Sequence, residues 1–414
     1  MALLIKNQPT KYYSSANDDL VYTCLESSLY VSVNFKYICD VYVNGIKIAQ
    51  LKSFPNPVSH LGVFNIGNVV RNYVESNLTF TNNTMLVQYF LNHKALVQCK
   101  FGYEYGTTQT QYLNVTVSEE GVFVNTYNKI RTSGSTPVLA YKEFLFATNR
   151  PEKSKVYWES AQERNPLLIP YFPGAYESQP YNIVLSFTTV RKSDGATTYP
   201  PNYTITNGGV NYRMTQLDLS PNSINAWLYG TYINSDTLYY TVQISTVDVD
   251  SQDVDSQVYY FYPYCESKYE VTTIAWLNQY GGYDSYQFSK KSKTSYQSEK
   301  KSFERIPYLI NSTTGVMSYN TSSMGLAQNE STIVYDSKFK QSMTFNTDII
   351  DEETYAWLSE LIISPSVFIQ LPNSNFTPVI IKDSNYEFKK RVNDKVFNLT
   401  VNVELQQQMN TQYR

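Results

Sequence analysis

Alternation of apolar and polar residues recurs along most of this 414-residue chain. The clearest case lies near the end, where apolar side chains occupy every second position: Phe397, Leu399, Val401, Val403 and Leu405. A period of two places such side chains on one face of a β-strand. The pattern therefore predicts a mainly β fold.

Turn residues separate several of these alternating segments. Asn44-Gly45 stands between residues 41–43 and 46–48, and this dipeptide is typical of a type I′ hairpin turn. Asp194-Gly195 follows a second stripe that contains Ile183, Leu185 and Phe187. Both segments are expected to be antiparallel strands.

Helix signals are few. The best lies at residues 351–365, where Asp351 can cap a helix, two glutamates complement its N-terminal dipole and Pro365 ends it. Its apolar stripe consists of Tyr355, Leu358, Leu361 and Ile362. A weaker candidate, with Val69, Val70 and Tyr73 at helical spacing, covers residues 65–77.

The chain is long enough for several domains. Breaks in the pattern fall at residues 131–137, 149–155 and 173–180. We expect β-sandwich-like modules plus a C-terminal α+β domain with one clear amphipathic helix. The expected divisions are an N-terminal β domain at 1–135, a connecting segment at 136–178, a β-sandwich-like module at 179–265 and the α+β domain at 266–414.

Composition favours broad contact with a partner. Charged residues make up only 17% of the chain, whereas there are 39 tyrosines. Tyrosine is enriched at protein interfaces, although it also favours strands, so both explanations stay open. The net charge of −3 argues against a dedicated nucleic-acid site.

Catalytic and metal-binding motifs are missing from the sequence. The two histidines and the four cysteines (Cys24, Cys39, Cys99 and Cys265) form no zinc-binding spacing. We expect free buried thiols, with a Cys24–Cys39 disulfide as the alternative in an exported protein. The N-terminus lacks the apolar run of a signal peptide, and no stretch is long enough for a transmembrane helix. We expect no enzyme activity and no cofactor.

Two charged runs need separate interpretation. The acidic run contains Asp248, Asp250, Asp253 and Asp255. Without a glycine turn it suits calcium poorly, so we expect an exposed loop without metal. The basic, low-complexity run at residues 289–302 is expected to be a solvated loop or a mobile hairpin tip, with phosphate contact as the alternative.

The stretch WLNQYGGYDSYQFSKK at residues 276–291 raises three alternatives: a catalytic loop, a sugar-binding platform, or a structural hairpin. Its alternation predicts two strands joined at Gly281-Gly282, where glycine permits positive φ. Trp276 is expected to face a core or a partner. Tyr280 and Tyr283 are the residues that could hold a sugar, and Tyr283 is expected to be an exposed aromatic side chain. We favour a structural or assembly hairpin formed by Trp276, Gly281, Gly282, Tyr283 and Asp284.

The segment WLNQYGGYDSYQF resembles a signature in virion proteins of Bacteroidetes-infecting phages, including crAss-like podoviruses. The stretches ETYAWLSELIISPSVFI, FTPVIIKDSNYEFKK and NDKVFNLTVNVEL are similar to the same group, and VYVNGIKIAQLKSFPNP with GVFNIGNVVRNYV is a weaker match. About half of the chain is covered, whereas residues 179–265 show no resemblance. The resemblance implies a tail, collar or hub component without enzyme activity.

From this resemblance we expect a structural component of a phage tail, most simply a tail hub or collar ring protein. Its partners would be other virion proteins and copies of itself, with contact to the bacterial surface as a further option. It would be made in the host cytoplasm and located in the virion. The alternative is a receptor- or glycan-binding tail protein. A bacterial surface-associated binder is disfavoured by the missing export signal.

Overall fold

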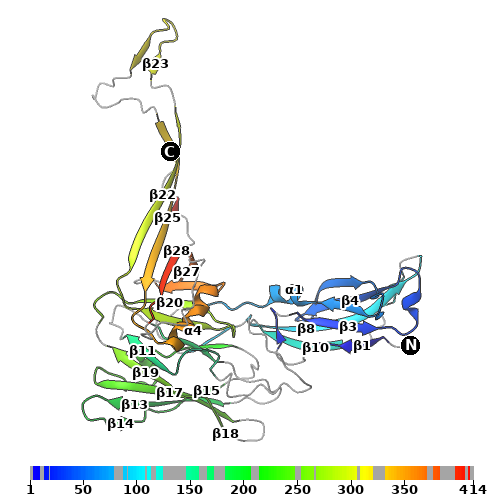
Figure 1. Ribbon diagram of the computed structural model, residues 1–414, viewed down its shortest axis with the longest axis horizontal. Helices are drawn as coiled ribbons and strands as arrows, with labels where there is room; N and C mark the ends of the chain where they lie inside the picture. Colours follow the sequence, from blue (N-terminus) through cyan, green and yellow to red (C-terminus); the bar gives the residue numbers. More distant parts are fainter. Residues whose placement is uncertain are drawn as a thin grey trace.

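A computed structural model of the chain is shown in Figure 1. It describes residues 3–9, 14–17, 19–78, 87–90, 92–107, 110–112, 118–124, 146–157, 166–171, 182–206, 214–247, 253–264, 267–304, 308–319, 332–370, 376–382, 397–405 and 409–410. The protein is mainly β and contains several multi-strand sheets, so the predicted fold class is confirmed.

The N-terminal part is a sandwich of two sheets (Figure 1). The first contains β1 (Leu4–Asn7), β3 (Val21–Leu25) and β6 (Gly62–Asn65). The second runs in the order β2 (Ser14–Ser15), β10 (Ser118–Val124), β8 (Lys94–Tyr105), β4 (Lys36–Val43) and β5 (Ile46–Ser53), with β9 (Thr110–Tyr112) beside β8. Short helical turns are η1 (Leu29–Val31), α1 (Gly67–Val70) and η2 (Arg71–Tyr73).

The core of this sandwich follows the strand alternation. Tyr22 of one sheet packs against Phe101 of the other, with ring centroids 5.4 Å apart. Cys24, Cys39 and Cys99 are buried in the same core as free thiols, so the alternative Cys24–Cys39 disulfide is wrong. Cys265 lies outside the described residues.

The predicted Asn44-Gly45 turn is confirmed. Both residues have positive φ, 49° and 81°, which is the type I′ requirement. β4 and β5 pair on either side of it. The helix expected at residues 65–77 is much shorter than predicted, because α1 and η2 together cover only 67–73.

The middle part is built on a sheet with the order β11 (Lys153–Tyr157), β19 (Tyr259–Tyr264), β17 (Thr237–Val247), β13 (Asn182–Arg191) and β14 (Thr197–Thr198). β15 (Tyr203–Thr206) pairs with β13, and β18 (Asp253–Asp255) pairs with β17. Ile183, Leu185 and Phe187 are buried as the alternation predicted, and Gly195 turns the chain with a φ of 68°. Helix α3 (Pro221–Trp227) covers part of the same core and had no sequence prediction.

A small three-stranded sheet connects distant segments. Its order is β12 (Leu168–Tyr171), β16 (Thr215–Asp218) and β7 (Val87–Tyr89). β11 and β12 both come from the segment expected to be a connection, and each is a strand in a sheet with the middle part. β12 also lies against β21 of the C-terminal part.

The C-terminal sheet has the order β21 (Tyr283–Phe288), β20 (Thr272–Leu277), β26 (Val367–Gln370), β27 (Phe376–Ile381), β28 (Thr400–Leu405), β25 (Thr332–Asn346) and β22 (Lys293–Glu304). The apolar stripe predicted near the end of the chain is confirmed, since Val401 and Val403 of β28 are fully buried.

Helix α4 (Glu352–Ile363) packs on the C-terminal sheet and confirms the predicted amphipathic helix. The Asp351 side chain accepts a hydrogen bond from the backbone N–H of Thr354 at 2.8 Å, as its sequence position indicated. Tyr355, Leu358 and Leu361 are buried as expected. Trp357 is buried as well, although it was not part of the predicted stripe.

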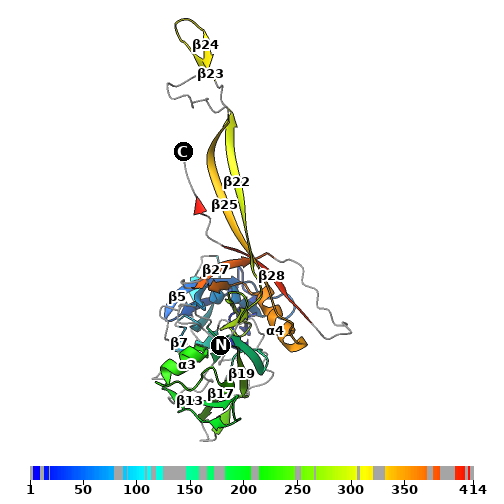
Figure 2. The same ribbon diagram turned by 90° about the vertical axis from the view of Figure 1, so that its left-hand side faces the viewer.

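β22 and β25 continue beyond the body as a two-stranded ribbon, which we call the arm (Figures 1 and 2). The small hairpin β23 (Tyr308–Ile310) and β24 (Met317–Tyr319) lies at its far end, and β29 (Met409–Asn410) pairs with β25 along it. The expectation of a loop or hairpin tip at residues 289–302 is wrong, because most of this run belongs to strand β22. All twelve residues of β22 are nevertheless exposed to solvent.

No helix within the described residues is long and apolar enough to cross a membrane.

Asp351→Ala should lower the free energy of unfolding by about 1 kcal/mol, because the N-terminal cap of α4 is lost. Urea denaturation would measure this. Asp351→Asn is the matched control, since its side-chain oxygen can still accept the hydrogen bond. Equal loss in both variants would contradict the capping role.

Candidate functional site

The WLNQYGGYDSYQF segment forms the predicted hairpin of β20 and β21. Leu277 lies opposite Tyr283, and Gly281 has a φ of 87°. The side-chain oxygen of Asn278 accepts hydrogen bonds from the backbone N–H groups of Tyr280 and Gly282, at 3.0 and 3.2 Å. Glycine freedom and the asparagine side chain together fix this turn.

The hairpin lies at the centre of the molecule. Trp276, Tyr283 and Asp284 are each at most 1% exposed. The expectation that Tyr283 is exposed is therefore wrong, although Trp276 faces a core as predicted. The ring of Tyr283 packs in a cluster with Leu78, Phe90, Ala147, Leu168, Met214, Ala275 and Leu277, which come from all parts of the chain.

Hydrogen bonds connect the hairpin to the N-terminal part. Ser76 Oγ donates to the carbonyl oxygen of Gly281 at 2.7 Å. The hydroxyl of Tyr283 donates to the carbonyl oxygen of Ser76 at 2.8 Å, and it lies 3.0 Å from Ser366 Oγ. Tyr283 was expected to contact a partner protein, but it is buried and connects two parts of the same chain.

Further hydrogen bonds connect the hairpin to the middle part and to the segment before it. The Gln216 side chain exchanges two hydrogen bonds with the backbone of Tyr283, at 2.8 and 2.9 Å. Asn278 Nδ2 donates to the carbonyl oxygen of Ala147, and Ser285 Oγ accepts from the backbone N–H of Leu168, both at 2.8 Å. The hairpin therefore holds three sequence segments against the C-terminal sheet.

Gly282 is required for close packing. A Cβ atom placed on it would lie 2.2 Å from the Cβ of Pro170 in β12. Its neighbour Gly281 serves the turn through positive φ, so the two glycines have different roles.

A network of buried charged and polar side chains surrounds Asp284 of β21. Asp284 Oδ2 accepts hydrogen bonds from Thr148 Oγ1 at 2.7 Å and from Trp357 Nε1 at 2.9 Å. The guanidinium of Arg150 lies 4.3 Å from the Trp357 ring centre and donates to the carbonyl oxygen of Ser285. Burial raises the pKa of Asp284, while the Arg150 charge and the hydrogen bonds oppose that rise. Burial lowers the pKa of Arg150 to about 10, so it stays cationic at neutral pH.

Glu360 of α4 extends this network. Its Oε1 accepts hydrogen bonds from Asn149 Nδ2 at 2.6 Å and from Gln279 Nε2 at 3.0 Å. Burial, aided by the charge of Asp284, raises the pKa of Glu360 to about 7. The contact between the helix and the hairpin therefore contains an acid that titrates near neutral pH.

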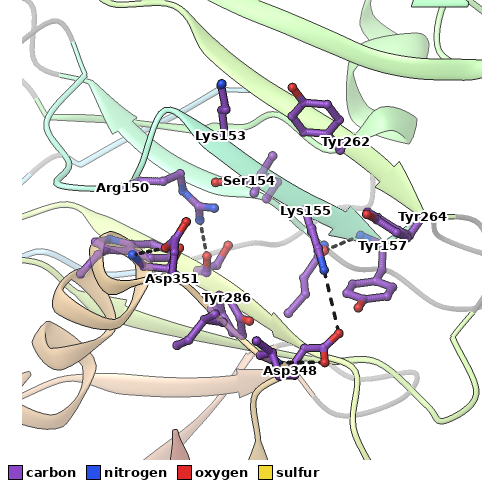
Figure 3. A pocket seen from close by; sticks show the side chains of 17 residues that line it. Arg150, Lys153, Ser154, Lys155, Tyr157, Tyr262, Tyr264, Tyr286, Asp348 and Asp351 are labelled. Atoms are coloured by element: carbon purple, nitrogen blue, oxygen red, sulfur yellow. Dashed lines mark hydrogen bonds and ion pairs between the residues drawn. The ribbon is translucent and has the colours of Figure 1, made fainter. Parts of the chain in front are cut away.

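A cavity of about 260 Å³ opens beside this network, between β11 and β19 on one side and β21 with the start of α4 on the other (Figure 3). Arg150, Ser285 and Trp357 are among the residues that line it. Lys155 points across it toward Asp348, with 4.0 Å between the charged atoms (Figure 3). Tyr157 and Tyr264 lie together at one end, their ring centroids 6.0 Å apart.

The carboxylate of Asp348 is held by lysines. Its second oxygen lies 3.2 Å from Lys290 Nζ. Partial burial would raise the pKa of Asp348, but hydrogen bonds from the Ile349 N–H and from Lys290, together with the lysine charges, lower it overall. Asp348 is thus an ionised acceptor at the edge of the cavity. The geometry suits binding of a polar ligand through several hydrogen bonds.

The arm is a second candidate surface. Tyr296 is 67% exposed and lies on one face with Phe339, at a ring distance of 5.8 Å. Phe303 and Tyr335 form another pair farther out, at 6.2 Å. The face opposite Tyr296 carries the cross-strand pair Glu299 and Lys338 and the ion pair of Lys301 with Asp336.

The acidic run is only partly described. Asp253 and Asp255 belong to β18, which pairs with β17, so the expected loop is wrong for this half of the run. Asp248 and Asp250 lie outside the described residues. Among the residues that the structure describes, no group of three or more His, Cys, Asp or Glu side chains could hold a metal ion. The expectation of no bound calcium stays a prediction.

Comparison with known proteins gives little similarity. No protein-family model matches the chain, and no curated protein matches it. One solved structure similar to it is that of extracellular domains 3–5 of Drosophila OTK, with 8% sequence identity, 82% of this chain and 92% of that chain covered, and a TM-score of 0.20. A TM-score this low carries no inference about fold or function.

No pattern in the sequence marked Arg150, Trp357 or Glu360 as a site residue. Arg150 stands in a stretch that looked like a break, and Trp357 and Glu360 lie between positions of an ordinary helical stripe. Their roles depend on contacts with Asp284 and Gln279, residues more than seventy positions away.

Gly282→Ala should lower the free energy of unfolding by about 3 kcal/mol, because its Cβ would overlap Pro170. Gly195→Ala is the matched control, since Gly195 has positive φ but open space around it, and should lose only about 1 kcal/mol from backbone strain. Chemical denaturation would compare them. Equal losses would contradict the close approach.

The stability of the protein should fall as pH rises from about 4.5 to about 7. The folded pKa of Glu360, about 7, exceeds its ordinary value of 4.5, so in this window the folded state binds a proton that the unfolded state releases. Glu360→Gln should flatten this part of the profile, measured by urea midpoints across pH. Glu270→Gln, on an exposed side chain, should leave the profile unchanged. A profile that is the same in all three proteins would contradict the prediction.

Proposed function

We propose that this protein is a structural component of a phage tail, a hub or collar protein present in several copies in a ring. The observation that carries the proposal is the arm. It is a long two-stranded ribbon that leaves the body and has every residue of β22 exposed (Figure 2). The resemblance of the WLNQYGGYDSYQF segment to phage virion proteins supports the same conclusion.

A free two-stranded ribbon is marginally stable in water, because neither face buries a core. The arm carries aromatic pairs on its surface, Tyr296 with Phe339 and Phe303 with Tyr335. Aromatic side chains of this kind dominate the binding energy of protein interfaces. A neighbouring protein that covers the arm would therefore stabilise it.

The outer edge of β22 offers a second mode of contact. β22 is the last strand of its sheet, and within the described residues it pairs only with β25. An edge strand presents unpaired N–H and C=O groups that can accept a strand from another chain. The lysines along it limit unspecific pairing.

Charge supports association between copies. Residues 290–346 contain eight basic and four acidic residues. The chain as a whole has 33 basic and 36 acidic residues, which leaves 25 basic and 32 acidic for the remainder. A cationic arm on an otherwise anionic protein is attracted to the body of the next copy.

In this role the protein has no catalytic activity and no cofactor. It is made in the host bacterial cytoplasm and located in the virion. Its internal hairpin fixes the modules relative to one another, as a ring component requires. Its partners would be copies of itself and neighbouring tail proteins.

The test is to remove the arm without disturbing the body. Tyr296 and Gln341 lie opposite each other, so residues 297–340 can be replaced by a two-residue Asn-Gly turn. We expect the full chain to form a discrete oligomer in mass photometry and negative-stain images, and the shortened chain to be a folded monomer. A matched variant, Lys300→Glu with Lys301→Glu, should weaken association while the melting temperature stays unchanged.

Two results would contradict the proposal. One is a full chain that stays monomeric at high protein concentration and at every salt concentration. The other is a stable trimer that forms equally well without the arm, which is the behaviour of a fibre-like binder.

A further inference from the structure

Five tyrosines lie on one face of the middle sheet, and we call them the tyrosine stripe. Alternation places Tyr260, Tyr262 and Tyr264 of β19 on the face opposite the buried Tyr259 and Phe261. The stripe is completed from the neighbouring strands by Tyr239 and Tyr157.

The rings of the tyrosine stripe form two groups of close contacts. Tyr239 lies 5.6 Å from Tyr262 and 5.9 Å from Tyr260, and Tyr157 lies 6.0 Å from Tyr264. None of the five is buried, and Tyr264 is 44% exposed. The stripe leads into the cavity, because Tyr157, Tyr262 and Tyr264 also line it (Figure 3).

Most charged groups of the cavity already contact a neighbour, and Lys153 adds a further cation to the lining. Asp348 contacts Lys155 and Lys290, and Asp351 caps α4. Arg150 stacks on Trp357 and donates to a backbone carbonyl. An ionic ligand that paired with Asp348, Lys155 or Arg150 would have to disrupt these contacts. A neutral ligand with many hydroxyl groups can instead donate to Asp348 and accept from Lys155 without separating charges.

We propose that the cavity and the tyrosine stripe form a binding site for a neutral oligosaccharide. One sugar ring enters the cavity beside Tyr157 and Tyr264, which line it. There Asp348, Lys155 and the Tyr286 hydroxyl form hydrogen bonds with the hydroxyl groups of the sugar. The next rings stack on Tyr262, Tyr239 and Tyr260. Aromatic walls with a few convergent polar groups are the general form of such sites, and tyrosine offers a flat apolar face with a polar end.

This site is separate from the arm, and it does not depend on the proposed role in assembly. The stripe lies on the middle sheet, whereas the arm extends from the C-terminal sheet (Figure 1). The variant with residues 297–340 replaced should therefore keep its sugar binding. Loss of assembly and loss of sugar binding can then be told apart.

The experiment is calorimetric titration of the full chain with maltotriose, cellotriose and chitotriose, supported by saturation-transfer NMR. We expect at least one trisaccharide to bind. Tyr264→Ala should weaken that binding about tenfold, because one aromatic contact is lost. Tyr199→Ala is the control, since Tyr199 is 76% exposed and follows β14 at the other edge of the same sheet.

Asp348→Asn provides a second measurement that does not remove an aromatic ring. It should also weaken binding, while thermal melts verify that each variant is folded. The proposal fails if no neutral trisaccharide binds at millimolar concentration, if only anionic sugars bind, or if Tyr264→Ala and Asp348→Asn bind as the parent does. It also fails if Tyr264→Ala abolishes self-association in a protein that binds no sugar, because the stripe would then be a protein interface.

Discussion

The arrangement of the modules depends on the burial of one hairpin. β20 and β21 present backbone groups and side chains to Ser76, Ala147, Leu168 and Gln216, which belong to separate stretches of the chain. The hydroxyl of Ser76, the carbonyl of Ala147, the N–H of Leu168 and the amide of Gln216 are all buried. Without the hairpin in place they would lack these hydrogen bonds, and a buried polar group without a partner costs free energy. The hairpin thus makes one body from segments that could otherwise move independently, and both the cavity and the arm keep fixed positions relative to it.

The buried charges beside the hairpin contribute specificity more than stability. Desolvating Arg150 and Asp284 costs free energy that their mutual attraction only partly offsets. The stacking of Arg150 on Trp357 and the hydrogen bond from Thr148 to Asp284 belong to the observed arrangement. Alternative packings of α4 against the sheet would leave a buried charge without partners.

Local patterns predicted the local structure well. Asn44-Gly45, the stripe ending at Leu405 and the cap at Asp351 all act through neighbours within a few residues, so the sequence displays them directly. Tyr283 was misjudged because alternation tells which residues share a face, but not whether a second module covers that face. The cavity was missed for the same reason, since Lys155, Asp348 and Tyr264 meet only when three distant segments pack together.

β25 is fifteen residues long and runs from its pairing with β28 in the core out into the arm, with one register shift in its pairing with β22. Its backbone hydrogen bonds to β28 lie perpendicular to the strand direction. A pull along the arm therefore loads all of these bonds at once in shear, whereas a sideways pull would open them one after another. Because Phe345 of the same strand is anchored in the core, tension on the arm is transmitted into the body as a whole. The root of the arm should therefore resist an axial pull better than a sideways one.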